Sequence, residues 1–241
     1  MKTVAARPYP YTFDPKHTAV VLIDMQRDFL EPGGFGAMLG NDVTTLQRIV
    51  PACRKLLVLA REHGMHVIHT QEAHDPQLAD CPPSKKARGG LKCGIGDTGP
   101  LGRVLVIGEA GADFVPELQP EASDTVLRKP GKGAFHATGL DALLHAKGIT
   151  HLLIGGVTTE VCVQTTMCEA TDRGYECLLV QDCAASYFPQ FHDSVVEMVV
   201  AQGGIVGWAA PLAAIEASLK EGAAIEATLE AALDAATAPP L

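Results

Sequence analysis

The chain lacks the features that would place it in a membrane or among secreted proteins. Among its 241 residues, no apolar run reaches the roughly 18–20 residues that a transmembrane helix needs. The opening stretch MKTVAARPYPYTF holds no continuous apolar segment of signal-peptide length. Its seven cysteines are odd in number, and most lie within or beside apolar runs, whereas disulfide frameworks belong to short secreted chains. We therefore expect a cytoplasmic protein in which most cysteines are buried as small hydrophobic residues.

Positive charge is also scarce. Lys and Arg number 19 against 28 Asp and Glu, which gives a net charge of −9. Nucleic acids and anionic membranes attract proteins with a positive face, so neither is an expected partner. Hydrophobic residues make up 47%, a proportion typical of globular proteins. A chain of this length buries about 70% of its unfolded surface, so its core can be stable without disulfide bonds.

Short apolar runs alternate with stretches of helical periodicity. The expected strands are 19–24, 65–70, 124–129, 151–156, 175–182 and 204–208, and the expected helices are 41–63, 138–147, 159–173 and 190–202. Such alternation is typical of right-handed βαβ units. We predict a three-layer α/β/α domain with a central, mostly parallel six-stranded sheet over residues 17–210, preceded by an N-terminal extension, 1–16.

The last thirty residues differ in composition from the rest. The segment AAIEASLKEG at 213–222 is repeated as AAIEATLEAA at 223–232. Two copies are too few for a solenoid, which needs about three or more repeats. Because Ala and Glu dominate, we predict a helical appendage over 211–241 that packs on the body or on a neighbouring subunit.

Ligands bind open parallel sheets beyond the carboxyl ends of the strands, so residues that end strands are the informative ones. Asp24 ends the first predicted strand and Lys129 ends the third. Asp24 could serve as a turn residue or as a carboxylate that relays protons. Lys129 could be a solvated strand end or a cation that stabilises a thiolate.

Cys162 follows the fourth predicted strand. Thr158 or Thr159 is expected to cap the next helix, and Glu160 places an acidic residue in its first turn. In that first turn, the helix dipole and free amides lower a thiol pKa and can stabilise an oxyanion. Cys168 is expected to point elsewhere. On spacing alone, a buried structural cysteine is an equally good interpretation of Cys162.

Two other kinds of chemistry lack their motifs. The sequence contains no CxxC pair, which argues against a thiol redox protein. RKPGKGAF at 128–135 superficially resembles a phosphate loop, but GxxxxGK[ST] is absent. A binding subunit without catalytic activity stays open as a further alternative.

Three segments together resemble the isochorismatase-like cysteine hydrolases. They are IDMQRDF at 23–29, LRKPGKGAF at 127–135 and GGVTTEVCVQTTMCEATDRGYECLLVQD at 155–182, within a resemblance that covers about 17–210. The resemblance implies a catalytic triad of Asp24, Lys129 and Cys162. It also implies a non-proline cis peptide before Thr158 and an oxyanion hole formed by the backbone amides of Thr158 and Cys162.

Within that group, which includes nicotinamidases and N-carbamoylsarcosine amidohydrolase, the chain is most similar to biuret and triuret hydrolases. The similar stretches include HTQEAHDPQLADCP at 69–82 and MVVAQGG at 198–204. The resemblance implies a small neutral ureido substrate bound by Lys132, Gln202, Phe29 and Thr158, no cofactor, and a homotetramer. N-carbamoyl amino acids and nicotinamide are the alternative substrates.

Nicotinamidases hold a metal ion with an Asp-x-His-x5-His pattern and a later His. The corresponding residues here are Glu72, His74 and Asp80, and the later His is missing. This set could bind a metal in principle. The incomplete pattern instead predicts no metal, with Glu72 and His74 hydrogen-bonded within their loop.

Overall fold

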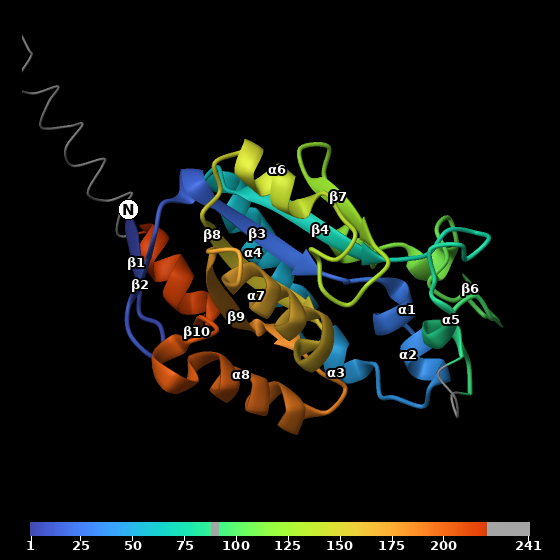
Figure 1. The fold of residues 1–241 in the computed structure, drawn as a ribbon. Coiled ribbons are helices and arrows are strands. Elements are labelled where there is room, and N and C mark those ends of the chain that lie inside the picture. Colours follow the sequence, from blue (N-terminus) through green and yellow to red (C-terminus); the bar gives the residue numbers. More distant parts are fainter. Residues whose placement is uncertain (88–91, 221–241) are drawn as a thin grey trace, which may run out of the picture.

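Six parallel strands form the centre of the molecule (Figure 1). The computed structural model describes residues 1–87 and 92–220. The sheet order is β10-β9-β8-β3-β4-β7, and every neighbouring pair is parallel. The strands are β3 (Thr18–Ile23), β4 (His66–Glu72), β7 (Thr125–Lys129), β8 (His151–Val157), β9 (Glu176–Ala185) and β10 (Trp208–Ala210). The predicted fold class is confirmed, and the predicted mostly parallel sheet is parallel throughout.

Side chains alternate between two hydrophobic cores, one on each face of the sheet. All six residues of β3 are buried. Val20 and Leu22 belong to the first core, whereas Ala19, Val21 and Ile23 belong to the second. Successive side chains of a strand point to opposite faces, so a continuous apolar run requires helices on both sides.

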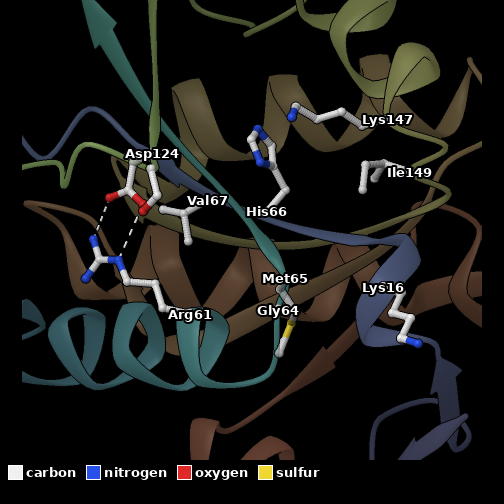
Figure 2. A pocket seen from close by; sticks show the side chains of 10 residues that line it. Lys16, Arg61, Gly64, Met65, His66, Val67, Asp124, Lys147 and Ile149 are labelled. Atoms are coloured by element: carbon white, nitrogen blue, oxygen red, sulfur yellow. Dashed lines mark hydrogen bonds and ion pairs between the residues drawn. The ribbon is translucent and has the colours of Figure 1, made fainter.

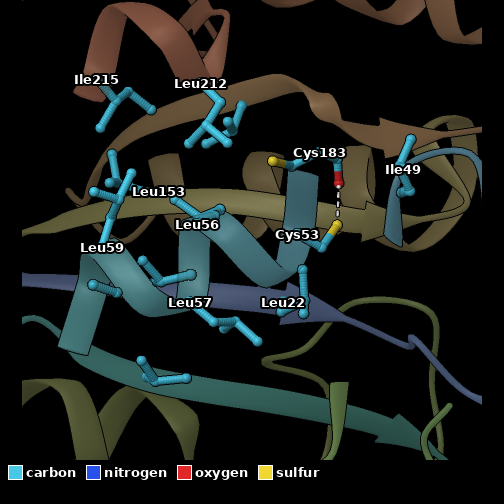
Figure 3. Close-up of a cluster of buried hydrophobic side chains, with 14 of the residues drawn as sticks. Leu22, Ile49, Cys53, Leu56, Leu57, Leu59, Leu153, Cys183, Leu212 and Ile215 are labelled. Atoms are coloured by element: carbon cyan, nitrogen blue, oxygen red, sulfur yellow. Dashed lines mark hydrogen bonds between the residues drawn. The ribbon is translucent and has the colours of Figure 1, made fainter. Parts of the chain in front are cut away.

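Helix α4 (Val50–Glu62) covers the first face. Figure 3 shows Cys53, Leu56 and Leu57 of α4 over Leu22 and Leu153 of the sheet. The predicted single helix 41–63 is divided into α3 (Thr44–Gln47) and α4. Pro51, which has no backbone N–H to donate, lies in the first turn of α4, where that loss costs least.

Three helices cover the second face: α6 (Leu140–Ala146), α7 (Gln164–Thr171) and α8 (Pro189–Gly204). Helical geometry in α8 breaks at 201–203, where Gln202 and Gly203 have φ of 53° and 77°. Gly204 and Gly207 continue this left-handed backbone with φ of 82° and 147°. The predicted strand 204–208 is therefore wrong in its bounds, because these residues turn the chain before it pairs as β10.

The first residues of the chain and the last described ones, up to residue 220, pack on the body. Strands β1 (Lys2–Val4) and β2 (Tyr11–Phe13) pair antiparallel, a 3₁₀ turn η1 (Pro15–His17) follows, and Arg7 bridges to Ala209. Residues 212–220 are helical, and Leu212, Ile215 and Leu219 join the first core. The rest of the predicted appendage, with the second copy of the repeat, lies outside the described residues.

Short elements gather beyond the carboxyl ends of the strands (Figure 1). They are α1 (Arg27–Leu30), α2 (Phe35–Met38), α5 (Pro83–Lys86), β5 (Thr98–Gly99), β6 (Gly102–Arg103), η2 (Ala110–Ala112) and η3 (Pro116–Leu118). Their loops lie over the edge of the sheet where a ligand site is expected. Within the described ranges, no helix has the length and apolar character to cross a membrane.

Candidate active site

Four buried side chains meet at the carboxyl edge of the sheet. Asp24, Glu72 and Lys129 are 0% exposed and Cys162 is 5% exposed. One ligand-type atom from each of Asp24, Glu72 and Cys162 lies within 4.8 Å of the others. Lys129 Nζ is 2.7 Å from Asp24 Oδ2 and 3.7 Å from Glu72 Oε2. The structure thus brings the three side chains of the predicted triad together and adds a second carboxylate.

Asp24 stands where the chain leaves β3. Its φ of 51° falls in the left-handed region, which Asp tolerates better than most residues. Thr70 on β4 donates its hydroxyl to Asp24 Oδ1 at 2.6 Å and accepts the Asp24 amide at 3.1 Å. One carboxylate oxygen is therefore held by Thr70, and the other faces the ammonium of Lys129.

The ammonium of Lys129 is surrounded by acceptors. Besides its ion pair with Asp24, it donates to the carbonyl oxygens of Gly131 and Lys132, each at 3.0 Å. Burial alone would lower the pKa of Lys129, but the charges of Asp24, Cys162 and Glu72 outweigh it and raise that pKa. Lys129 is therefore a permanent cation, and the turn after β7 folds its carbonyls back onto the charge.

The backbone around Cys162 differs in detail from the predicted helix start. Residues Thr159–Val163 form a π-helical turn that leads into α7, so Cys162 lies in that turn. Thr158 occupies the N-cap without a side-chain hydrogen bond, and Thr159 Oγ1 lies 3.0 Å from His192 Nδ1 instead. The predicted side-chain cap is wrong, because Thr158 makes no capping hydrogen bond and the Thr159 hydroxyl lies beside His192.

The peptide bond between Val157 and Thr158 is cis, as the resemblance implied. Gly156, with φ of 113°, lets β8 approach β3 here, because a Cβ at this position would overlap the backbone of Ile23. The assignment of the Thr158 and Cys162 amides to an oxyanion hole stays a prediction.

The surroundings of Cys162 favour the thiol over the thiolate. Burial, followed by the negative charge of Asp24, raises its thiol pKa well above the ordinary value, and Lys129 and Lys132 counter this only in part. The prediction that the helix start lowers this pKa is therefore wrong for the free protein, because desolvation and two carboxylates outweigh the dipole. Formation of the thiolate needs a base, and Asp24 is within reach.

Glu72, at the end of β4, was expected from the sequence to be hydrogen-bonded within its loop or, less favoured, to bind a metal, and it was not expected beside Cys162. Its Oε2 lies 3.7 Å from Cys162 Sγ. Burial alone would raise its pKa, but Lys129, Lys132 and Lys85 lower it to about 2. Neighbouring parallel strands end at the same edge of a sheet. Because Glu72 ends the strand beside β3, its position in the sequence could have predicted that it lies near Asp24.

Gln26 and Asp28 account for the rest of the IDMQRDF motif. The Gln26 amide group accepts the Glu72 N–H at 2.8 Å and donates to the Glu72 carbonyl at 3.0 Å, which fixes the end of β4. Asp28 accepts the Leu105 amide at 2.8 Å, while burial raises the Asp28 pKa. These two side chains hold the covering loops to the sheet.

The side chains at the nicotinamidase metal positions surround an ammonium group. Lys85 Nζ lies 2.8 Å from Glu72 Oε1, 3.0 Å from His74 Nε2 and 2.5 Å from the carbonyl oxygen of Pro130. On its other side, His74 Nδ1 is 3.2 Å from Asp80 Oδ1. Because Lys85 already lies between Glu72 and His74, these residues do not fit a metal ion.

A small chamber of 180 Å³ opens onto Cys162. Its lining includes three residues of the predicted substrate site, Phe29, Thr158 and Lys132. Glu160 also lines it, and its Oε2 is buried without a hydrogen-bond partner among the residues that the structure describes. A buried acceptor of this kind is suited to an N–H group of a ligand.

Gln202 does not line this chamber in the single chain, and its predicted contact with the substrate stays a prediction. Helix α8 starts just after the carboxyl end of β9 and runs back along the sheet, a rise of about 18 Å over twelve helical residues. Gln202 stands at the far end of α8 and is exposed. The resemblance matched Gln202 to a family position, but it did not show at which end of the sheet this residue lies.

A wider hollow of 430 Å³ lies at the amino ends of β4 and β7 (Figure 2). Figure 2 shows Lys16, His66 and Lys147 around it, with Arg61 bound to Asp124. The hollow lies at the end of the strands opposite to Cys162, and Cys162 is not among its lining residues. The chemistry therefore belongs to the smaller chamber.

Comparison with known proteins identifies the family. The sequence profile of the isochorismatase domain matches residues 18–210. An isochorismatase family protein from Desulfovibrio vulgaris has a similar structure, with 29% identity, a TM-score of 0.69, and 85% of this chain and 98% of that chain covered. The chain belongs to the isochorismatase family and is therefore a hydrolase, as the resemblance predicted.

Two other solved structures share the fold at lower identity. A cysteine hydrolase from Pseudomonas syringae is 21% identical with a TM-score of 0.75, covering 88% of this chain and 96% of that one. An N-carbamoylsarcosine amidase from Thermoplasma acidophilum is 24% identical with a TM-score of 0.62, covering 81% and 96%.

Proposed function

We propose that this protein is a cysteine-dependent amidohydrolase that releases ammonia from a small ureido compound, biuret or triuret, through a thioester intermediate. The observation that carries the proposal is the contact of Cys162 with a buried Asp24–Lys129 ion pair beneath a 180 Å³ chamber. A nucleophile, a base and a fixed cation are the groups that two-step acyl transfer requires.

In the first step, Asp24 takes the proton of the Cys162 thiol, and the sulfur attacks a terminal carbamoyl carbon. Lys129 stabilises the negative charge on sulfur. The carbonyl oxygen becomes an oxyanion held by the amides of Thr158 and Cys162. The C–N bond then breaks, and Asp24 returns its proton to the leaving nitrogen as ammonia departs.

In the second step, Asp24 takes a proton from water, whose oxygen attacks the thioester carbon. The C–S bond breaks, and the sulfur leaves as a thiolate that recovers the proton from Asp24. The products are ammonia and a carboxylated ureide. Asp24 serves as base and acid in both halves, and its ion pair with Lys129 holds the carboxylate in place.

The chamber suits a neutral planar substrate. A ureide presents alternating carbonyl acceptors and N–H donors. Lys132 offers a donor and Glu160 an unpaired acceptor, while Phe29, Phe35 and Tyr187 supply aromatic surface. The volume of 180 Å³ is sufficient for a compound of few heavy atoms.

Ammonia release from a panel of biuret, triuret, N-carbamoylsarcosine and nicotinamide tests the proposal, with Cys162→Ala as the blank. The expected result is turnover of biuret or triuret with the highest kcat/KM. Preference for N-carbamoylsarcosine, the substrate named for one structural relative, would support the alternative of an N-carbamoyl amino acid amidohydrolase. We also propose that the protein is a cytoplasmic homotetramer. Light scattering of the purified protein would measure its number of subunits.

A further inference from the structure

Lys85 lies outside the predicted triad, yet its ammonium belongs to the same cluster of charges. It comes from α5, one of the short elements above the sheet, and its side chain is 16% exposed. Its contacts are to Glu72 Oε1, His74 Nε2 and the Pro130 carbonyl, at 2.8, 3.0 and 2.5 Å. Three acceptors from two segments of the chain, 72–74 and the turn after β7, thus converge on one lysine.

Glu72 connects this lysine to the nucleophile. Its Oε1 accepts from Lys85, whereas its Oε2 lies 3.7 Å from Cys162 Sγ. Lys132 spans both oxygens at 2.9 and 3.2 Å, and Lys129 approaches Oε2 at 3.7 Å. The orientation of Glu72 against the thiol is therefore set by three ammonium groups.

A count of charges shows what the third cation adds. Lys129 and Lys132 balance the two carboxylates that act on the thiol, Asp24 and Glu72. The thiolate formed in the reaction is a further anion, and Lys85 is a further cation. Glu160 also lines the chamber as an acidic group, so the site has no surplus of positive charge without Lys85.

His74 adds no charge of its own. Burial and the neighbouring Lys85 lower its pKa, while Asp80 opposes this shift. A neutral His74 with Nδ1 facing Asp80 presents the lone pair of Nε2 to Lys85. The lysine is therefore held by a neutral imidazole and a carbonyl, and its charge is available to Glu72.

We propose that Lys85 is a positioning residue that acts through Glu72: it holds this carboxylate against Cys162 and supplies the cation that offsets the thiolate. This inference rests on the proposed function only in taking Cys162 as the nucleophile. Lys85 thus acts on the nucleophile from a helix that covers the sheet. Cys162 is then fully reactive only when α5 is folded in its place.

The test is the rate of Cys162 alkylation by iodoacetamide as a function of pH, read at Cys162 by peptide mass spectrometry. Lys85→Met removes the charge and keeps the length of the side chain. The matched control is Lys86→Met, one residue further on α5 and exposed. We expect about tenfold slower alkylation at neutral pH for Lys85→Met and a profile displaced to higher pH, with Lys86→Met like wild type.

Lys85→Arg should restore most of the rate, because it keeps the charge near Glu72. If Lys85→Met fails to fold, Lys85→Gln replaces it, with the same expectation. Unchanged or faster alkylation in the folded charge-removing variant would overturn the proposal. An unreactive Cys162 in the wild-type protein would instead overturn the proposed function, so the two failures are distinguishable.

Discussion

Lys129 Nζ and Asp24 Oδ2 lie 2.7 Å apart although β4 separates their strands in the sheet. Both side chains are fully buried, so neither charge is screened by water. Asp24 receives its second support from Thr70 on the intervening strand. The base and the cation are therefore fixed by three strand ends rather than by a mobile loop.

Replacing Asp24 by Asn should abolish proton transfer and leave the shape of the side chain nearly unchanged. General acid–base catalysis contributes about 10²–10⁴-fold, and we expect a fall in kcat within that range. Steady-state ammonia release measures it, with circular dichroism as the control for folding. A variant with at least half the wild-type kcat would exclude Asp24 as the base.

Cys162→Ser should fold normally, because the hydroxyl is isosteric with the buried thiol, and should lose essentially all turnover. In the wild-type protein, acid quenching during turnover should trap an adduct on the peptide that contains Cys162. Mass spectrometry detects it. Cys168→Ser is the matched control, since Cys168 is exposed and lies outside the chamber.

Activity should survive exhaustive chelation. The ammonium of Lys85 lies between Glu72 and His74, where a metal bound by these residues would have to lie. The measurement is kcat/KM after prolonged dialysis against EDTA and dipicolinate, with metal content verified by mass spectrometry. Loss of activity that zinc, iron or manganese restores would show that this cluster had been misinterpreted.

Local apolar patterns predicted the sheet, whereas the triad was implied by the resemblance of three motifs to a known family. Apolar runs located the five strands β3, β4, β7, β8 and β9, and the charged residues that end such runs indicated Asp24 and Lys129. The bounds of β10 were wrong because consecutive left-handed residues after Ala201 override the apolar pattern.

Properties that depend on tertiary contacts were beyond the sequence. The thiol pKa of Cys162 follows from its burial and from carboxylates on two other strands, neither of which the 159–173 pattern contains. Lys85 reaches Glu72 from a covering helix thirteen residues on, at a spacing that no motif predicts. Gln202 matched a family position, but it lies at the end of α8 that is farther from the carboxyl edge of the sheet.

Glu72 should make the stability of the fold depend on pH. Its pKa is lowered from 4.5 to about 2 in the folded protein, so the folded state holds fewer protons than the unfolded state between these values. Its contribution is therefore complete above about pH 5 and is lost as the pH falls toward 2. Urea unfolding of Glu72→Gln and wild type between pH 3 and 7 tests this.

At pH 7, Glu72→Gln should reduce the free energy of unfolding by about 3 kcal/mol, because it leaves buried ammonium groups without their partner. The difference from wild type should shrink as the pH is lowered. A constant difference across the range would mean that Glu72 is not charged in the folded protein at neutral pH.

Glu160 is the residue that we expect to distinguish substrate recognition from activation of the nucleophile. Glu160 lines the chamber, and its buried Oε2 has no hydrogen-bond partner among the described residues, so we expect a substrate N–H to bind this carboxylate. Loss of a partner for a buried polar group costs about 1–3 kcal/mol, which corresponds to roughly a ten- to hundredfold loss in kcat/KM. Glu160→Ala should show that loss for the ureide.

The same variant should leave the alkylation of Cys162 by iodoacetamide unchanged, because Asp24, Lys129 and Glu72, rather than Glu160, act on the thiol. Lys129→Ala is the contrasting variant and should slow alkylation, since it removes the cation beside the sulfur. Equal slowing in both variants would show that Glu160 supports the nucleophile. The neutral acceptor in Glu160→Gln should recover part of kcat/KM, because a carboxamide oxygen still accepts the substrate N–H.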